Sequence, residues 1–248
     1  MRTSNPALSE KTFRGLESTG SVMTIEGTVN KSLFLILLVL GGAYFTWTQA
    51  FPTGWSTGTP PEILVWYLPA ILGAFVLSLV IIFKKTTAPY LAPVYAVLEG
   101  AVLGILSSIF EARYPGIVFQ AVVCTLGTFL ALLFSYKTNL IRATDNIKLG
   151  ICAATGGIAL VYLIDLGLHF FGMQVPLIHE SGPLGIGVSI LITAVAAFNL
   201  VLDFDFIETG ANARAPKYME WYAAFGLLVT LVWLYIEMLR LLAKARKK

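Results

Sequence analysis

The chain has 248 residues, of which 57% are hydrophobic and only 12% are charged, and its mean hydropathy is +0.79. Such a composition excludes an ordinary water-soluble domain and predicts a protein that resides in a membrane. The 17 Lys and Arg residues outnumber the 14 Asp and Glu residues, giving a net charge of +3. Because the basic residues lie in short stretches beside long apolar runs, we interpret them as topology signals and expect no nucleic-acid partner.

Residues 1–30 are polar, carry mixed charge and show no sustained apolar period. We interpret them as a polar cytoplasmic N-terminal tail. The apolar run that follows, 32–50, is too long for the hydrophobic part of a signal peptide and lacks a small-residue cleavage site. We therefore expect it to remain in the protein as the first membrane span.

Six further apolar runs follow along the chain. Each of the seven has about the 20 residues that a helix needs to cross a hydrocarbon core. The predicted spans are 32–50, 63–83, 90–110, 116–136, 149–171, 183–206 and 221–242. These runs are too long and too uniformly apolar for barrel strands. The sequence therefore predicts an all-α membrane protein with seven transmembrane helices, in one polytopic domain over 31–248.

The distribution of basic residues predicts how the chain is oriented. With the N-terminus in the cytoplasm, eleven Lys and Arg residues fall in cytoplasmic segments, whereas the loops on the other side hold only Arg113. That bias supports a cytoplasmic N-terminus. The basic C-terminal residues from Arg240 to Lys248 oppose the rule, because seven crossings place them outside. Either the last run enters the membrane and returns, or it crosses fully despite its basic end.

Small residues four positions apart predict close contacts between helices. Gly100 and Gly104 form such a pair in the third run, and Ala153 and Gly157 form another in the fifth. Small side chains allow two helix backbones to approach each other in lipid. We therefore expect both pairs at helix interfaces.

Carboxylates in or beside the spans are the residues that say most about function. A charged side chain at the bilayer centre costs about 2.5 to 3.5 kcal/mol on insertion scales, and no Lys or Arg lies mid-span to neutralise one. The six candidates are Glu99, Asp165, Asp203, Asp205, Glu208 and Glu237. Groups of this kind are suited to handling protons or cations.

Four polar residues cluster near the end of the sixth run. Asn199 and Asp203 are one helical turn apart, so we expect both to face the interior of the bundle. Asp205 points about 200° away from Asp203 and shares a face with Glu208. We expect these two to face a mouth or a basic loop residue. The candidate loop partners are Lys217 and Arg214. The alternative is that the whole cluster lies at the membrane interface.

Three stretches, "AVLEGAVLG" in the third run, "NLVLDFDFIETGA" in the sixth and "APKYMEWYAAFGLLVTLVWLYIEMLRLL" at the end, resemble the Bax inhibitor-1 family, in particular its bacterial branch. The resemblance extends from the first span to the C-terminus. It implies a central last helix surrounded by the other six, in a bacterial plasma (inner) membrane. It also implies a pH-sensitive calcium leak channel that a pair of aspartates gates.

By this resemblance, Asp203 takes the place of the gate aspartate in the sixth span, and Glu99 matches the glutamate of the third-span Glu-Gly motif. The chain departs from the pattern at the second aspartate, whose position falls near Val229 or Thr230. The carboxylates that could substitute are Asp205, Glu208 and Glu220. Alternatively, Asp203 forms a weaker latch alone, bonded to Asn199, Thr230 or a lysine.

Our first hypothesis is a passive, proton-sensitive pathway for Ca²⁺ or other cations, without a cofactor. The expected gate and pH-sensor residues are Asp203, Asp205, Asn199 and Glu208. The expected ion pathway contains Glu99, Thr230 and Glu237. Because Ca²⁺ needs several oxygen ligands, we expect Asp203, Asp205 and Glu99 to contact it.

The second hypothesis is a non-conducting protein that binds or controls other membrane proteins or a membrane protease. In that case the buried carboxylates only fix how the helices pair. We expect no enzyme, because the sequence has no H-E-x-x-H, P-loop or G-x-S-x-G motif.

Overall fold

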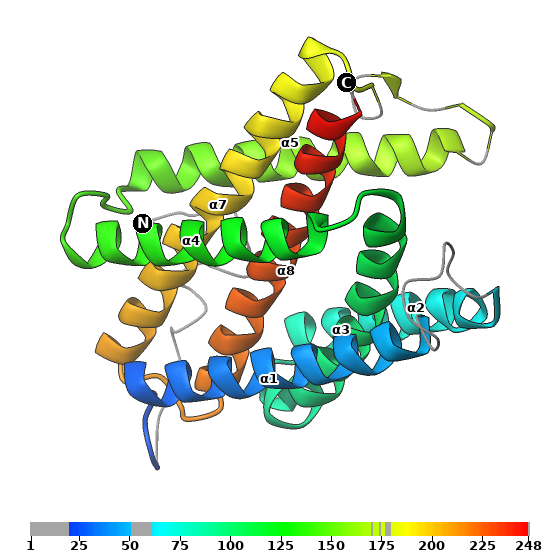
Figure 1. Ribbon diagram of the computed structural model, residues 1–248. Helices are drawn as coiled ribbons and strands as arrows, with labels where there is room; N and C mark the ends of the chain where they lie inside the picture. The colour runs from blue at the N-terminus through cyan, green and yellow to red at the C-terminus, as the bar shows by residue number, and fades with distance from the viewer. Residues whose placement is uncertain (1–19, 51–60, 170, 174, 177–179, 248) are drawn as a thin grey trace. The chain divides into compact units, whose positions relative to one another are not determined.

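The computed structural model describes residues 20–50, 61–169, 171–173, 175–176 and 180–247. These residues form seven α-helices and one 3-10 turn, as the all-α prediction requires. In chain order they are α1 (Ile25–Ala50), α2 (Pro61–Phe83), η2 (Lys85–Thr87), α3 (Ala88–Arg113), α4 (Ile117–Lys137), α5 (Asp145–His169), α7 (Pro183–Asn212) and α8 (Met219–Arg246) (Figure 1). Each α-helix contains most of one predicted span.

The helices extend beyond the apolar runs that predicted them. α7 continues past the predicted end at 206 to Asn212, and α1 begins at Ile25 rather than at 32. A polar residue ends an apolar run but does not end a helix, whose backbone hydrogen bonds continue until a cap or a turn. The cap of α1 is Thr24, whose Oγ1 accepts the N–H of Gly27 at 3.0 Å. Of the predicted tail 1–30, residues 1–19 lie outside the described residues.

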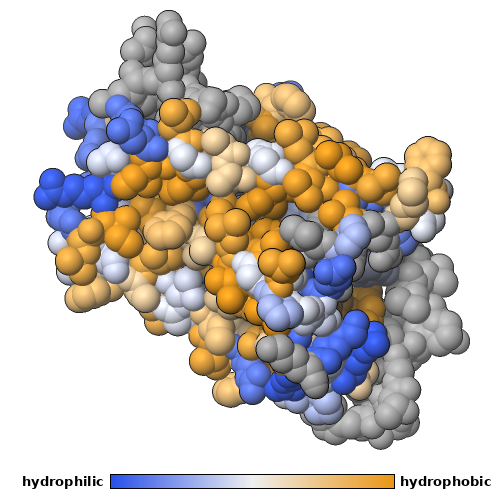
Figure 2. All heavy atoms as spheres, turned by 90° about the horizontal axis from the view of Figure 1, so that it is seen from above, coloured by the Kyte–Doolittle hydropathy of each residue, from blue (hydrophilic) through white to orange (hydrophobic). Residues whose placement is uncertain are grey.

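Apolar side chains cover much of the helix surface that the described residues expose. Among the described residues, six helices are long and apolar enough to cross a membrane, and the α2 segment Tyr67–Phe83 is a shorter apolar helix. Large side chains such as Phe45, Phe83 and Leu160 are exposed, and Figure 2 shows apolar groups spread widely over one face, with polar groups in separate patches. Exposed apolar surface on several long helices indicates a multi-pass membrane protein in a lipid bilayer.

The helices form two compact units. The α1–α3 unit contains α1, α2 and α3 with Phe206–Val229, and the α4–α5 unit contains Phe119–Asp205 with the α8 residues from Thr230 onward. The sequence predicts one polytopic domain, whereas α7 and α8 each contribute residues to both units.

Within the α1–α3 unit, α1 lies against α3 through glycines (Figure 1). A Cβ atom added at Gly100 would lie 2.2 Å from the carbonyl oxygen of Val39, and one at Gly104 would lie 2.1 Å from Thr46 Oγ1. Thr46 also donates a hydrogen bond to the carbonyl of Ala101 at 3.1 Å. Gly100 and Gly104 therefore form the predicted close helix contact, at which even a methyl group has no room.

The same contacts fix the directions of the first three helices. Val39 meets Gly100, and Thr46 meets Gly104, so residue numbers rise together along both helices and α1 and α3 are parallel. Between α2 and α3 lie only Lys84 and η2, and α2 packs against α3. Because this connection is short, α2 runs antiparallel to α3.

A buried glutamate shapes the turn between α3 and α4. Gly116 has a φ of +81°, a left-handed conformation that favours glycine. The Glu111 carboxylate accepts the backbone N–H groups of Gly116 and Val118, the latter at 3.0 Å. Because the first N–H groups of a helix have no partner within the helix, Glu111 serves as the cap of α4.

The second predicted pair of small residues does not lie at a helix contact in the described structure. Ala153 and Gly157 are exposed, and no described atom lies within 4 Å of a Cβ placed on Gly157. α5 instead contacts α7 through polar side chains, including a hydrogen bond from Asn199 to Thr155. Thr155 lies two positions from each small residue, so the polar contact turns the small residues outward.

Candidate functional site

Asp203 is a buried carboxyl group on α7 and forms the centre of the candidate site. Its side chain is 6% exposed, and Thr230 of α8 provides a hydrogen-bonding hydroxyl group to it. Among the buried side-chain oxygen and nitrogen atoms of the described residues, Oδ2 of Asp203 is the one without a hydrogen-bond partner. An unsatisfied carboxyl oxygen in an apolar interior is unfavourable when the group is ionised.

The sequence leaves three possible partners for Asp203, which are Asn199, Thr230 and a lysine. The structure places the hydroxyl group of Thr230 beside it. Thr230 is one of the two positions, Val229 or Thr230, near which the resemblance places the second gate aspartate, and its hydroxyl group lies beside the Asp203 carboxyl group. Asp203 and Thr230 both belong to the α4–α5 unit. The contact between Asp203 and Thr230 contains one titratable group, whereas a latch made of two aspartates contains two.

Asn199 lies one turn before Asp203 and is nearly buried, as the predicted inward-facing pair requires. Its side-chain amide donates to Thr155 Oγ1 and to the carbonyl of Val195, both at 2.8 Å. Asn199 thus connects α7 with α5.

Asp205 faces a different partner from the loop residues that the sequence suggests. Its carboxylate forms an ion pair with Lys148, in the first turn of α5, instead of with Lys217 or Arg214. Both side chains are partly exposed. Asp205 is two residues beyond Asp203 and therefore lies on another face of α7, which turns it toward α5. Glu208, farther along the same helix, is exposed.

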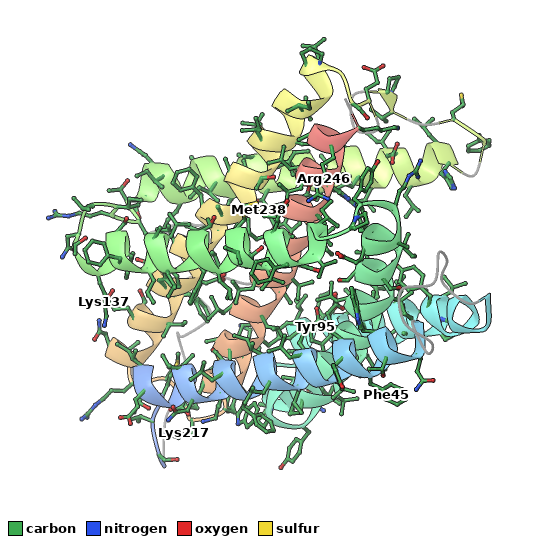
Figure 3. The ribbon with its side chains drawn as sticks, in the orientation of Figure 1. Phe45, Tyr95, Lys137, Lys217, Met238 and Arg246 are labelled. Carbon is green, nitrogen blue, oxygen red and sulfur yellow. The ribbon has the colours of Figure 1, made fainter. Side chains whose placement is uncertain are left out.

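Glu99 is half-buried on α3, within the α1–α3 unit. Tyr95, one turn earlier, provides a hydrogen-bonding hydroxyl group to its carboxylate. The Tyr95 ring meets the ring of Phe225 edge-on, with centroids 5.0 Å apart, on the side of α3 that faces the first half of α8 (Figure 3). The predicted mid-span glutamate therefore belongs to a polar pair beside an aromatic contact.

Glu237 is almost fully buried on α8 and has several hydrogen-bond donors. Its Oε1 accepts from Tyr162 at 2.8 Å and from Trp233 and Arg240 at 3.2 Å each. Arg240 also donates to Tyr162 at 2.9 Å. A carboxylate with these partners holds α8 against α5. The geometry favours a structural role for Glu237 over the predicted role in an ion pathway.

The C-terminal turns of α8 meet the ends of three other helices in the α4–α5 unit. Lys244 donates to Ser189 Oγ at 2.7 Å and to the carbonyl of Gly185 at 3.1 Å, both near the start of α7. Arg246, labelled in Figure 3, donates to Gln120 near the start of α4 at 2.9 Å. Tyr162, the partner of Arg240, lies near the end of α5. The basic end of α8 is thus engaged with polar groups of its neighbours.

No three Asp, Glu, His or Cys side chains of the described residues converge in a way that could hold a metal ion. Of the predicted calcium ligands, Asp203 and Asp205 belong to the α4–α5 unit and Glu99 belongs to the α1–α3 unit. Asp205 is paired with Lys148, and Asp203 is buried beside Thr230. Within the described part of the chain, Asp203 thus belongs to no group of three such side chains.

Sequence reasoning missed one buried carboxylate and gave another a different role. Glu111 caps α4, and the available signal for it was the Pro115-Gly116 turn sequence that follows it. Glu220, suggested above as a substitute for the second gate aspartate, instead accepts hydrogen bonds from Thr24 and forms ion pairs with Lys31 and Lys217. The threonine three positions before Gly27 resembles half of a helix-capping motif, which was the available signal for Glu220.

Comparison with known proteins identifies one relationship. A family model described as Bax inhibitor 1 like matches residues 5–247, which is nearly the whole chain. No curated protein and no solved structure matches the chain.

Proposed function

The chain belongs to the Bax inhibitor 1-like family, and from that premise we propose that it is a proton-sensitive passive leak channel for Ca²⁺ or other cations. The observation that carries the proposal is the buried carboxyl group of Asp203, with one unpartnered oxygen, beside Thr230. We propose that these two residues form the gate. Each comes from a different helix, so their contact joins α7 to α8.

In the closed state of the proposed gate, Asp203 carries a proton. A protonated carboxyl group has one O–H donor and remaining acceptor capacity, and a threonine hydroxyl can donate and accept. The neutral pair is therefore compatible with an apolar interior. The hydrogen bond between the pair holds α7 against α8, and the pathway stays closed.

Loss of the proton opens the proposed gate. An ionised Asp203 would be a buried anion whose hydrogen-bond partner is a neutral hydroxyl, which is costly without water or a counter-ion. The free energy is lowered when water or a cation reaches the carboxylate and the contact between the helices loosens. The negative charge then attracts the permeating cation, whose remaining ligands are waters and backbone carbonyls.

The neighbouring residues support the proposed gate in different ways. Asn199 and the pair of Asp205 with Lys148 both fix α7 against α5, so we propose that they position Asp203 without releasing a proton. Glu208 is exposed and suited to the mouth of the pathway. Glu99, half-buried beside Tyr95, is the proposed second carboxylate of the pathway in the α1–α3 unit.

We propose a bacterial plasma membrane location with the N-terminus in the cytoplasm and the C-terminus on the opposite side. α8 is one continuous helix of 28 residues, about 42 Å long at 1.5 Å per residue, which supports a full crossing over a segment that enters and returns. Three basic residues near the end of α8 donate hydrogen bonds to polar partners. These bonds offset the preference of basic residues for the cytoplasmic side of the membrane.

Flux through the purified protein tests the proposal. The protein is reconstituted in vesicles that contain a calcium-sensitive dye, and influx is compared at about pH 6 and about pH 8. We expect faster influx at the higher pH and a loss of this pH dependence in Asp203→Asn. Asp145→Asn is the matched control, because Asp145 is an exposed aspartate in the first turn of α5.

An unchanged pH profile in Asp203→Asn would remove Asp203 from the gate. The complete absence of flux above that of empty vesicles, at either pH, would contradict the channel. It would favour a non-conducting protein that binds or controls other membrane proteins.

A further inference from the structure

Glu220, in the first turn of α8, has a side chain with no exposed surface and is surrounded by donors from distant parts of the chain. Its Oε1 accepts the backbone N–H and the hydroxyl group of Thr24, both at 2.9 Å. Lys217 lies 2.8 Å from the same oxygen, and Lys31 forms an ion pair with Oε2. A buried carboxylate with two cations and two further hydrogen bonds is fully compensated.

Glu220 provides the carboxylate that the capping motif at the start of α1 lacks. In a capping box, the residue before the helix is Ser or Thr, and a Glu or Gln three positions later binds its backbone N–H. Thr24 caps α1 in this way, but the third position is Gly27. A Cβ atom added to Gly27 would lie 2.2 Å from Oε1 of Glu220. The carboxylate that the motif requires is therefore supplied by α8, in the space that a side chain at Gly27 would occupy.

The backbone reinforces this connection. The N–H of Met23 donates to the carbonyl of Ala215 at 2.7 Å, and the N–H of Lys217 donates to the carbonyl of Ser21 at 3.1 Å. These bonds form a short antiparallel bridge between Val22 and Pro216. The segment before α1 and the loop before α8 are thus paired by backbone hydrogen bonds on both sides of Val22 and Pro216.

One of the two cations around Glu220 also contacts an aromatic ring. Lys31 lies over the ring of Trp221, 5.5 Å from its centroid, and Lys217 lies beside the start of α1 (Figure 3). Lys217 is 45% exposed, so salt reaches at least this part of the cluster. An ion pair of this kind weakens when salt screens it.

We propose that Glu220, Thr24, Lys31 and Lys217 form a releasable ionic latch, which holds the segment before α1 on the start of α8. The latch is separate from the proposed gate and does not depend on ion conduction. Glu220 carries it, because one carboxylate accepts both hydrogen bonds from Thr24 and pairs with both lysines. Removing its charge breaks both ion pairs at once and weakens the cap.

Hydrogen–deuterium exchange of the full-length protein in detergent tests the latch. In Glu220→Gln we expect the amides of residues 21–31 and 213–222 to exchange at least about tenfold faster and to change together, since they share one opening. Glu26→Gln is the matched control, because Glu26 is an exposed glutamate in the first turn of α1. Raising the salt concentration should speed exchange of both segments in the unmodified protein.

Two results would overturn the proposal. One is unchanged exchange in Glu220→Gln, and the other is faster exchange in only one of the two segments. A double variant, Glu220→Ala with Gly27→Glu, separates the cap from the latch, since a glutamate at position 27 can cap α1 itself. We expect this variant to restore slow exchange at the start of α1 but to leave residues 213–222 fast. Slow exchange restored in both segments would show that the cap alone holds them.

Discussion

Gly100 of α3 packs so closely on Val39 of α1 that an added Cβ atom would lie 2.2 Å from the Val39 carbonyl oxygen. The obstacle is backbone, which cannot rotate away as a side chain can. In lipid, where apolar side chains gain little by leaving their solvent, such close packing is a main source of helix association. The contact therefore contributes directly to the stability of the α1–α3 unit.

Gly100→Ala should destabilise the protein, because α1 and α3 must move apart to admit the methyl group. We expect a loss of about 1 to 3 kcal/mol, as for other overpacked interiors. The measurement is the midpoint of thermal unfolding in detergent. Gly157→Ala is the control, since its Cβ meets no described atom within 4 Å and the substitution gains helix propensity. Equal midpoints for the two variants would contradict the close contact.

Glu237→Leu should lower stability but leave the pH dependence of ion flux intact. The change removes the acceptor shared by Tyr162, Trp233 and Arg240, and we expect a loss of about 2 kcal/mol or more. Tyr162→Phe should give part of the same loss, because it deletes one donor. Thermal unfolding and vesicle flux are measured on the same preparations. A shifted pH profile in Glu237→Leu would return Glu237 to the ion pathway.

The pair of Lys148 and Asp205 should contribute little to stability, despite its place next to the gate. Both side chains are partly exposed, and such pairs contribute about 0.2 to 1 kcal/mol. A double-mutant cycle with Lys148→Met and Asp205→Asn measures the coupling free energy in detergent. A coupling above about 2 kcal/mol would show that water does not screen the pair.

Glu111→Ala should destabilise the start of α4. The variant leaves the N–H groups of Gly116 and Val118 without their acceptor, and loss of a helix cap costs about 0.5 to 2 kcal/mol. Hydrogen exchange at residues 115–120 should become faster, while exchange in the middle of α4 stays unchanged. Glu111→Gln, which keeps one acceptor oxygen, should show a smaller effect. Identical exchange in the alanine variant and the unmodified protein would contradict the cap.

The two ends of the chain should lie on opposite sides of the membrane. The parallel course of α1 and α3 and the uninterrupted α8 support an odd number of crossings. A reporter that is active only outside the cytoplasm, fused after residue 248, should be active, whereas the same reporter at the N-terminus should be silent. Activity at both ends, or at neither, would contradict seven crossings.

Apolar runs predict the helices well because a membrane imposes a local requirement: about 20 apolar residues must follow one another. The polar ends of the helices escape this requirement, so α1 and α7 are longer than their runs. Helical periodicity also places Asn199 and Asp203 together on a buried face. These features depend on residues close in sequence.

The partners of the polar side chains depend instead on how distant helices pack. Periodicity places Asp203 and Asp205 on different faces of α7, but it cannot say that one meets Thr230 and the other Lys148. The same holds for Glu220, whose partner Thr24 is 196 residues away. For Ala153 and Gly157 in α5, the sequence predicted a helix contact that the described structure does not contain. Small residues permit close packing, but they do not by themselves provide a helix to pack against.

The preference of α1 for α3 over α2 has a consequence for how the protein is made. The chain emerges from the ribosome N-terminus first, so α1 reaches the membrane well before the helix that fits its glycine-lined face. A Cβ atom added at Gly42 of α1 would lie 2.5 Å from the carbonyl oxygen of Val97 of α3, and until α3 arrives this backbone faces lipid or an insertion factor. Slowing translation before α3 has left the ribosome should prolong that interval and expose α1 to degradation, whereas the same pause after α3 has entered the membrane should have no such effect.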